Sequence, residues 1–406
     1  MAKHTIEELQ QWQALPLNIK VLMTKDRIRS WINEYGEDGV YVSFSGGKDS
    51  TVLLDLVRNM YPSVKAVFVD TGLEYPEIRE FVKSFDNVDW LKPKMNFKQV
   101  IEKYGYPFIS KEVSECVDGA RKYLKILTDR QTDRQTDRQT DRQIIPNSPF
   151  MADMLGIDRR INKDNPSYQA IKMGNIPKEP ARLKKLLGTL EHRHNGILTG
   201  GVSNMYDRSR YKFFLDAPFN ISSMCCNVMK KQPAHIYGKE TGRKPMTAQM
   251  ASESKMRTQK WLQNGCNGFD MKSPISNPMA FWTEQDVLLY IKENNLPIAS
   301  VYGDIVIDYD AEGQLEGQMD MSELASEFGL FDIGNRPLKT TGCNRTGCMF
   351  CGYGCHLEKS PNRFERMKET HPKQYDYIMR PTEQGGLNYK EIIDWINQNG
   401  NMDIKY

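Results

Sequence analysis

The sequence has no long apolar run. None of its segments approaches the ~20 consecutive apolar residues that a membrane-spanning helix needs, and the N-terminal stretch has no apolar core of a signal peptide. Hydrophobic residues make up 39% and charged residues 26% of the 406 residues, which is typical of soluble globular proteins. We therefore expect a cytoplasmic protein with no membrane partner, too long to be one ordinary domain.

Basic residues are missing from one segment and concentrated in another. Residues 301–335 contain nine acidic residues and no Lys or Arg, whereas residues 151–260 contain 20 basic and 9 acidic residues. The basic middle indicates a polyanionic or phosphate-bearing partner, or else a solvated basic face.

Apolar periodicity predicts the order of the elements. Residues 5–35 have helical spacing that Pro16 divides into two helices. Residues 40–125 alternate between strand and helix, which predicts an α/β fold with a doubly wound parallel sheet and helices on both faces. Residues 196–201 are expected to form another sheet strand, and residues 301–335 a hairpin followed by a short helix.

These patterns divide the chain into four parts. They are an N-terminal helical segment at 1–35, an α/β domain at 36–300, an acidic insertion at 301–335, and a cysteine-rich knuckle with C-terminal helices at 336–406.

A short repeat interrupts the second part. Thr128–Gln143 consists of four identical copies of Thr-Asp-Arg-Gln, a polar pattern that predicts a low-complexity surface loop or an exposed, weakly helical segment. The tetranucleotide ACAG, read through all three frames, encodes the same four residues. We therefore hypothesise a slippage-prone, phase-variable DNA tract, which would give a variable repeat number when the gene is sequenced from single colonies.

Both common glycine-rich phosphate motifs are absent, since the chain has neither a Walker sequence nor G-x-G-x-x-G. Residues 45–50 instead read Ser-Gly-Gly-Lys-Asp-Ser, between an apolar strand pattern and a helical pattern. Gly46 and Gly47 let backbone N–H groups approach an anion, and the helix N-terminus adds its positive dipole end. Hydroxyl groups and positive charge come from Ser45, Lys48, Ser50 and Thr51. Asp49 fits bare phosphate poorly but fits a loop in which it holds Mg²⁺ or caps the helix, so we take Lys48 and Asp49 as candidate catalytic residues.

Structural disulfides are not expected among the eight cysteines of a cytoplasmic chain. Cys116 and Cys266 stand apart and are expected to be ordinary buried thiols. The others gather in two places, Cys225 with Cys226, and Cys343 with Cys348, Cys351 and Cys355. Cysteines at Cys-x-x-Cys spacing can hold one metal centre. Zinc would use the four cysteines between 343 and 355, with or without His356, and an iron–sulfur cluster would combine Cys225, Cys226, Cys348 and Cys351.

The loop and the segments after it resemble a known family. "SFSGGKDSTVLL" is similar to the pyrophosphate (PP) loop of the N-type ATP pyrophosphatases, and "VFVDTGLEYPEIREFV" resembles the subgroup typified by phosphoadenosine phosphosulfate (PAPS) reductase. "NPMAFWTEQDVLLYIKENNLPIASVY" is also similar to a family segment. The resemblance covers about residues 38–125 and 196–356 and implies an adenine nucleotide alpha hydrolase-like, Rossmann-like fold with helical additions at both ends.

The resemblance also implies roles for particular residues. Residues 45–51 would hold the phosphates or sulfate of an adenine nucleotide such as ATP, with Mg²⁺. Asp70 would lie beside the nucleotide, and Lys111 and Arg257 become candidate charge contacts. Ala248 and Met250 depart from the family's Gly-x-Arg pattern, which puts that part of the contact surface in doubt.

Iron–sulfur members of the family hold a four-iron cluster with a Cys-Cys pair followed by Lys or Arg and Pro, and a later Cys-x-x-Cys. "CCNVMKKQP" and "GCMFCG" occur here in the same order. The resemblance therefore implies a 4Fe-4S cluster on Cys225, Cys226, Cys348 and Cys351. It leaves open whether Cys343 and Cys355 are ligands.

The cysteine with which reductases of this family attack the sulfate group is missing, because no cysteine follows Cys355. We therefore expect an ATP-dependent, adenylating sulfur transfer to a nucleic acid or nucleotide, with a sulfur donor protein as partner. One alternative is a sulfonucleotide reductase that uses an atypical thiol. Another is a nucleotide-sensing regulatory subunit without turnover.

Overall fold

The structure is a computed structural model that describes residues 3–136, 180–194, 197–202, 204–309 and 336–406. The chain forms two compact units. Unit 1 comprises Met1–Phe97 and Cys226–Met349, and unit 2 comprises Lys98–Cys225 and Phe350–Tyr406. Each unit therefore combines pieces of several of the four segments expected from the sequence.

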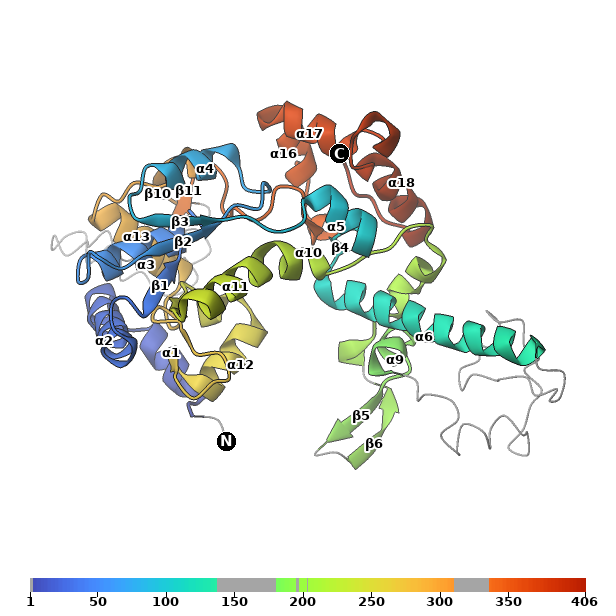
Figure 1. Ribbon diagram of the computed structural model, residues 1–406, viewed down its shortest axis with the longest axis horizontal. Helices are drawn as coiled ribbons and strands as arrows, with labels where there is room; N and C mark the ends of the chain where they lie inside the picture. The colour runs from blue at the N-terminus through green and yellow to red at the C-terminus, as the bar shows by residue number, and fades with distance from the viewer. Residues whose placement is uncertain (1–2, 137–179, 195–196, 203, 310–335) are drawn as a thin grey trace. The chain divides into compact units, whose positions relative to one another are not determined.

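A six-stranded sheet forms the centre of unit 1, in the order β3-β2-β1-β7-β9-β8. Its strands are β1 (Val40–Ser43), β2 (Ala66–Val69), β3 (Val88–Leu91), β7 (Lys244–Met246), β8 (Asn267–Gly268) and β9 (Ile275–Ser276). Neighbouring strands are parallel except for β8 and β9, which are antiparallel. Because the order runs outward from β1 on both sides, the sheet is doubly wound, as predicted. Figure 1 labels β1, β2 and β3 of this sheet.

Helices cover both faces of this sheet. Val40 and Val42 of β1 belong to the main core, whereas Tyr41 packs in a second cluster with Tyr237. Successive side chains of a strand point to opposite faces, so the two clusters lie on opposite sides of the sheet. The helices of unit 1 are α1 (Ile6–Gln13), α2 (Leu17–Tyr35), α3 (Lys48–Arg58), α4 (Pro76–Lys83), α11 (Gln232–Thr241), α12 (Lys255–Asn264) and α13 (Glu284–Glu293).

The expected break at Pro16 is confirmed. Thr5 and Glu8 form a capping box at the start of α1, and Pro16 is the N-cap of α2. α2 contributes the buried Trp31 to the main core.

The hairpin expected within 301–335 is formed differently. β10 (Ile305–Ile307) pairs antiparallel with β11 (Leu338–Thr340). The partner strand thus lies beyond the acidic segment, and the expected short helix lies outside the described residues, which omit 310–335.

Unit 2 contains smaller sheets and several helices. β4 (Phe108–Ile109) pairs parallel with β12 (Gly352–Tyr353), and Tyr389, Phe108, Phe214 and Phe364 are fully buried. Its helical elements are α6 (Lys111–Thr136), α9 (Ala181–Leu187), η2 (Ser209–Asp216), α16 (Arg363–Thr370), α17 (Pro372–Met379) and α18 (Tyr389–Gly400), while α5 (Phe97–Tyr104) and α10 (Met224–Cys226) cross between the units. No helix among the described residues is long and apolar enough to cross a membrane.

Two sequence expectations for unit 2 can be compared with the structure. The expected strand at 196–201 is found as β6 (Ile197–Val202), and it pairs with β5 (Glu191–His194) in a two-stranded sheet separate from the sheet of unit 1. Of the two structures expected for the repeat, loop or helix, its described part is helical, because α6 continues to Thr136. Thr-Asp-Arg-Gln contains no Gly or Pro that would end the helix. The rest of the repeat lies outside the described residues.

Candidate functional site

The Ser45–Ser50 loop joins the centre of the sheet to a helix. β1 ends at Ser43, and Gly47 is the N-cap of α3. The Ser50 hydroxyl accepts a hydrogen bond from the Ser45 N–H at 3.1 Å and donates one to the Gly47 carbonyl at 2.9 Å. The Thr51 hydroxyl donates to the same carbonyl at 3.0 Å. These bonds hold the loop around the N-terminus of α3, where backbone N–H groups and the helix dipole favour an anion.

A residue with a side chain does not fit at position 46 in this backbone conformation. Its φ is +72°, and a Cβ at this position would lie 2.8 Å from a methyl group of both Ile78 and Val82. Both residues belong to α4. The glycine therefore allows a left-handed turn and a close approach between the loop and α4.

Lys48 is buried, with 5% of its side chain exposed, and its ammonium lies 3.2 Å from the Glu284 carboxylate. The same ammonium lies 5.3 Å from the centroid of the Tyr302 ring. Glu284 is the first residue of α13, directly after its N-cap Thr283. The loop lysine is thus held between a carboxylate and an aromatic face.

Asp49 is surrounded by charges of both signs. Burial raises the pKa of Asp49, and Glu284 raises it further, while Lys48, Arg345 and Arg257 act in the opposite direction. Arg257, a charge contact predicted from the family resemblance, therefore lies within electrostatic reach of Asp49. Burial and the nearby Arg345 lower the pKa of Arg257.

Glu253 joins the two arginines. It forms an ion pair with Arg257, and its other carboxylate oxygen lies 3.8 Å from a guanidinium nitrogen of Arg345. The Met250 N–H also donates to Glu253 at 2.9 Å, which fixes the carboxylate. The loop thus belongs to what we call the charge cluster, formed by the cations Lys48, Arg257 and Arg345 and the carboxylates Asp49, Glu253 and Glu284.

A cavity of about 150 Å³ lies beside the loop, at the carboxyl ends of β1 and β2. Ligands of doubly wound sheets bind at this edge, and a cavity of about this volume holds a single aromatic ring. Its lining includes Ser45, Val69, Glu74, Lys230, Thr346 and Gly347. The cavity therefore offers room for part of a nucleotide next to the anion site.

Asp70 follows β2 at the same edge of the sheet and is only 6% exposed. It accepts hydrogen bonds from Arg79 at 2.8 Å and from the Gly72 N–H at 3.2 Å. Lys111, the other expected charge contact, belongs to unit 2, where it is exposed at the first residue of α6. Unit 1 thus contains Ser45 to Thr51, Asp70 and Arg257, whereas Lys111 belongs to unit 2.

The division between the units falls inside both expected cysteine pairs. Cys226 and Cys348 belong to unit 1 and Cys225 and Cys351 to unit 2. In unit 1, burial opposes the ammonium form of Lys230, but Cys348, Glu74 and Cys226 raise its pKa. In unit 2, Cys351, Cys225 and Cys355 add to the effect of burial in raising the pKa of Tyr389.

In each unit, one cysteine of each pair thus acts electrostatically on the same polar side chain, Lys230 in unit 1 and Tyr389 in unit 2. Four thiols are the donor set that iron–sulfur clusters use, so the residues fit such a cluster chemically. Within the described residues, no three His, Cys, Asp or Glu side chains are grouped so as to hold a metal ion.

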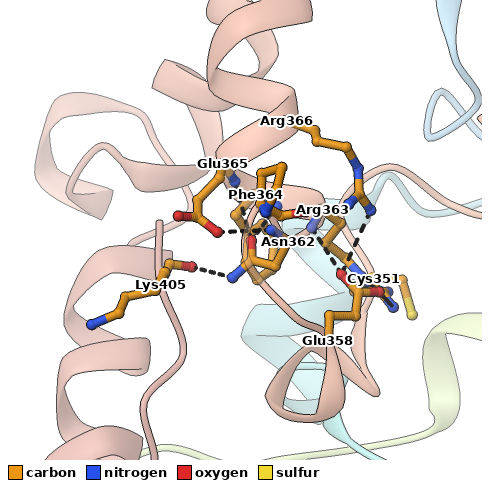
Figure 2. Close-up of polar contacts among 9 residues, drawn as sticks. Cys351, Glu358, Asn362, Arg363, Phe364, Glu365, Arg366 and Lys405 are labelled. Atoms are coloured by element: carbon orange, nitrogen blue, oxygen red, sulfur yellow. Dashed lines mark hydrogen bonds and ion pairs between the residues drawn. The ribbon is translucent and has the colours of Figure 1, made fainter. Parts of the chain in front are cut away.

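The segment after Cys351 is held by a polar network, shown in Figure 2. Arg363 donates to the Cys351 carbonyl at 2.6 Å and to the Glu358 carboxylate at 2.9 Å. Asn362 caps α16 and donates to the Lys405 carbonyl at 2.8 Å. Burial raises the pKa of Cys355 to about 12, so this thiol stays protonated near neutral pH in the absence of a metal.

The two cysteines that stand apart in the sequence, Cys116 and Cys266, are buried as expected. Burial raises the pKa of each thiol. They are ordinary core thiols, as the sequence predicted.

Three members of the charge cluster were not among the sequence predictions. Glu284 had a local signal, because it follows the N-cap Thr283 in a segment that already resembled the family. Arg345 lies three residues before Cys348, and the pattern around it predicts only a cysteine-rich segment. Glu253 lies in "ASESKMR", four residues before Arg257, a spacing that favours an ion pair on a helical turn.

A comparison with known protein families agrees with the α/β fold. Residues 39–140 match the family model described as the phosphoadenosine phosphosulfate reductase domain. The chain therefore carries a PAPS-reductase-like α/β domain whose sheet is mostly parallel.

Individual relatives match only a part of the chain. A stretch of 96 residues is 36% identical to an uncharacterized protein of Methanocaldococcus jannaschii and covers 21% of this chain and 23% of that protein. A stretch of 90 residues is 29% identical to phosphoadenosine 5′-phosphosulfate reductases of two Xylella fastidiosa strains and covers 22% of this chain and 36% of theirs. The chain thus spans well under half the length of these relatives. Among solved structures, the PAPS reductase of Candida auris in a phosphate complex matches with 12% identity and a TM-score of 0.32, over 75% of this chain and 96% of that one.

Proposed function

We propose that this protein binds Mg²⁺–ATP at the Ser45–Ser50 loop and activates a substrate by adenylation, as the first step of a sulfur transfer. The observation that carries the proposal is the charge cluster around Lys48 and Asp49. Three cations and three carboxylates gather around this loop, whose position at a helix N-terminus suits an anion.

The balance of charge in the cluster favours a metal nucleotide over a bare anion. Lys48 is already paired with Glu284, and Arg257 with Glu253. A polyphosphate that arrives alone would have to replace these carboxylates, whereas Mg²⁺ would offset them. Mg²⁺ is commonly held by one or two carboxylates together with substrate phosphates, and Asp49 and Glu284 are suited to that role.

The residues of unit 1 would then divide the work of adenylation. An oxygen of the substrate attacks the α-phosphorus, the bond to the bridging oxygen of the β-phosphate breaks, and pyrophosphate leaves. The loop N–H groups, Lys48 and Arg257 stabilise the negative charge that develops on the leaving pyrophosphate. When bound, Mg²⁺ would add charge stabilisation at the same phosphates. A sulfur nucleophile from a donor protein then displaces AMP from the activated substrate.

We further propose that Cys225, Cys226, Cys348 and Cys351 are ligands of a 4Fe-4S cluster. Thiolate is the donor that such clusters use, and Lys230, beside Cys226 and Cys348, is suited to offset negative charge on the sulfur atoms. Such a cluster would supply redox chemistry or a relay for sulfur. Zinc on the same thiols is the other outcome of a metal analysis.

The proposed acceptor is a nucleic acid or a nucleotide. Its support is the excess of basic residues in 151–260, a feature that also occurs on solvated surfaces. Turnover measured with and without RNA or DNA tests this part separately.

A second candidate is reduction of a sulfonucleotide, favoured by the match of residues 39–140 to the PAPS reductase domain. This reaction needs a thiol that attacks the sulfate sulfur and a second thiol that resolves the product. It predicts sulfite release from PAPS or adenosine phosphosulfate with a thiol reductant. Nucleotide binding without any turnover would instead favour a regulatory subunit.

The experiment that tests the proposal is an anaerobic incubation with Mg²⁺–ATP, in which AMP and pyrophosphate are measured. Lys48→Ala and Asp49→Ala should abolish the release of pyrophosphate. If both variants keep the activity of the wild type, the loop has no part in the reaction.

A further inference from the structure

The segment Cys343–Cys348 contributes a residue to the loop site that neither the family resemblance nor the comparisons assign. We propose that Arg345 binds the phosphates of the nucleotide as a second arginine, opposite Arg257. This inference rests on the proposed function, since the ligand is the phosphate chain that the loop would hold.

The segment is fixed in place by backbone hydrogen bonds near both of its ends. The Cys343 N–H donates to the Val301 carbonyl at 2.9 Å, and the Met349 N–H donates to the Leu73 carbonyl at 2.8 Å. Between these points, the Thr346 hydroxyl is hydrogen-bonded to the Tyr302 hydroxyl. Arg345 therefore starts from an anchored backbone.

The same contacts place the segment against the phosphate loop. A Cβ on Gly47 would lie 3.4 Å from the Tyr302 hydroxyl oxygen and 4.0 Å from the Thr346 hydroxyl oxygen. The Lys48 ammonium lies over the Tyr302 ring. Arg345 precedes Thr346, and its guanidinium lies 3.8 Å from Glu253, the carboxylate that also pairs with Arg257. At this place its positive charge opposes the effect of burial on the pKa of Asp49.

The guanidinium of Arg345 is available to a ligand. Its side chain is 61% exposed, and its separation of 3.8 Å from Glu253 is beyond hydrogen-bond range. Arg257, by contrast, contacts Glu253 directly. Glu253 thus positions Arg257 while it leaves hydrogen-bond donors of Arg345 for another acceptor.

Two guanidinium groups near each other are unfavourable without an anion. Arg345 lowers the pKa of Arg257, which is the electrostatic sign of this repulsion. A phosphate group between the two arginines would relieve the repulsion and accept charge-assisted hydrogen bonds from both. The loop N–H groups and Lys48 would hold other oxygens of the same polyphosphate.

Binding measurements with the full-length protein test the proposal. Mg²⁺ with a non-hydrolysable ATP analogue, and inorganic pyrophosphate, are titrated into the wild type, Arg345→Ala, Arg345→Lys and Arg29→Ala. Arg29 is an exposed arginine on α2 in the same unit and serves as the matched control. We expect Arg345→Ala to lower the affinity for both ligands about tenfold, because a charge-assisted contact is lost. The affinity of Arg345→Lys should lie between those of Arg345→Ala and the wild type, and Arg29→Ala should bind like the wild type.

The outcomes separate this inference from the proposed function. If the wild type binds the analogue and Arg345→Ala binds it within twofold of the wild type, the role of Arg345 is overturned while the proposed function stands. If the wild type binds neither ligand, both are overturned. Thermal unfolding of each variant checks that the fold is intact, and Arg345→Lys provides the comparison should Arg345→Ala unfold.

Discussion

The ammonium of Lys48 lies 3.2 Å from the carboxylate of Glu284, although the two residues are 236 positions apart in the chain. Lys48 begins α3 and Glu284 begins α13. The N-termini of two helices therefore meet at the Ser45–Ser50 loop, each with a charged side chain of opposite sign. This pair gives the buried ammonium of Lys48 an ionic partner, and it makes the carboxylate a competitor of the proposed phosphate ligand.

Removal of the loop lysine should abolish catalysis without unfolding the protein. For Lys48→Ala we expect pyrophosphate release to fall about 100-fold or more, because a charge contact to the leaving group is lost. Lys83→Ala removes an exposed lysine of α4 in the same unit and should leave the rate unchanged. Equal rates for Lys48→Ala and Lys83→Ala would contradict the mechanism.

Neutralisation of Glu284 should change the metal requirement. Glu284→Gln leaves the charge cluster with one excess positive charge. We therefore expect metal-free pyrophosphate, titrated in the presence of a chelator, to bind about 2–5-fold more tightly. This change in affinity corresponds to the free energy of a partly exposed ion pair. The same change should weaken the binding of Mg²⁺–ATP. Glu293→Gln, at the other end of α13, is the control. Weaker binding of metal-free pyrophosphate to Glu284→Gln would show that this carboxylate does not compete with the ligand.

Gly46→Ala should destabilise the protein more than an ordinary glycine substitution does. Gly242 has a φ of +74° in the left-handed region with open space around it, whereas Gly46 has a φ of +72° and close contacts with α4. Gly242→Ala should cost only the left-handed strain of about 1–2 kcal/mol, and Gly46→Ala a further amount of about 1–3 kcal/mol for overpacking. Urea unfolding measures both values, and equal losses would remove the steric argument.

Low pH should destabilise the fold of unit 2 because it protonates the carboxylate of Glu358. Burial opposes the shift, but the hydrogen bonds and charge of Arg363 hold the pKa of Glu358 below its ordinary value. A carboxyl whose folded pKa is lowered stabilises the fold fully above the unfolded pKa, about 4.3 for Glu, and this contribution disappears as the pH falls through the folded value. Thermal unfolding should therefore show a smaller loss of stability below pH ~4.3 in Glu358→Gln than in the wild type. An unchanged pH profile would contradict this role.

The cysteine prediction is tested by metal content. After anaerobic purification, we expect iron, acid-labile sulfide and visible absorption in the wild type, and their loss in Cys226→Ser and Cys348→Ser. Cys266→Ser, which alters a buried core thiol, should keep the iron. A colourless wild type with stoichiometric zinc would refute the cluster.

Local signals were enough to predict the start of the fold. The alternation from β1 to β3, the Ser45–Ser50 loop and the break at Pro16 each depend on neighbouring residues, and each is found as predicted. Arg257 near the loop came from the family resemblance and not from periodicity.

Pairings between distant segments were not readable in the same way. Glu284 meets Lys48, and β10 pairs with β11 across the acidic segment, because the fold of unit 1 brings together residues that lie far apart in the sequence. Nothing in the residues around Arg345 indicates Asp49 as a neighbour. For the repeat, the sequence left a loop and a weakly helical segment as alternatives, because a polar repeat without apolar periodicity does not decide between them. In the structure, α6 continues into the repeat as far as Thr136.

The most direct test of the account is the fate of ATP. The anaerobic protein is incubated with Mg²⁺–ATP, with and without RNA or DNA, and AMP and pyrophosphate are quantified. The account predicts both products in equal amounts, dependent on Lys48. Sulfite release from PAPS with a thiol reductant, together with no pyrophosphate from ATP under any of these conditions, would contradict it.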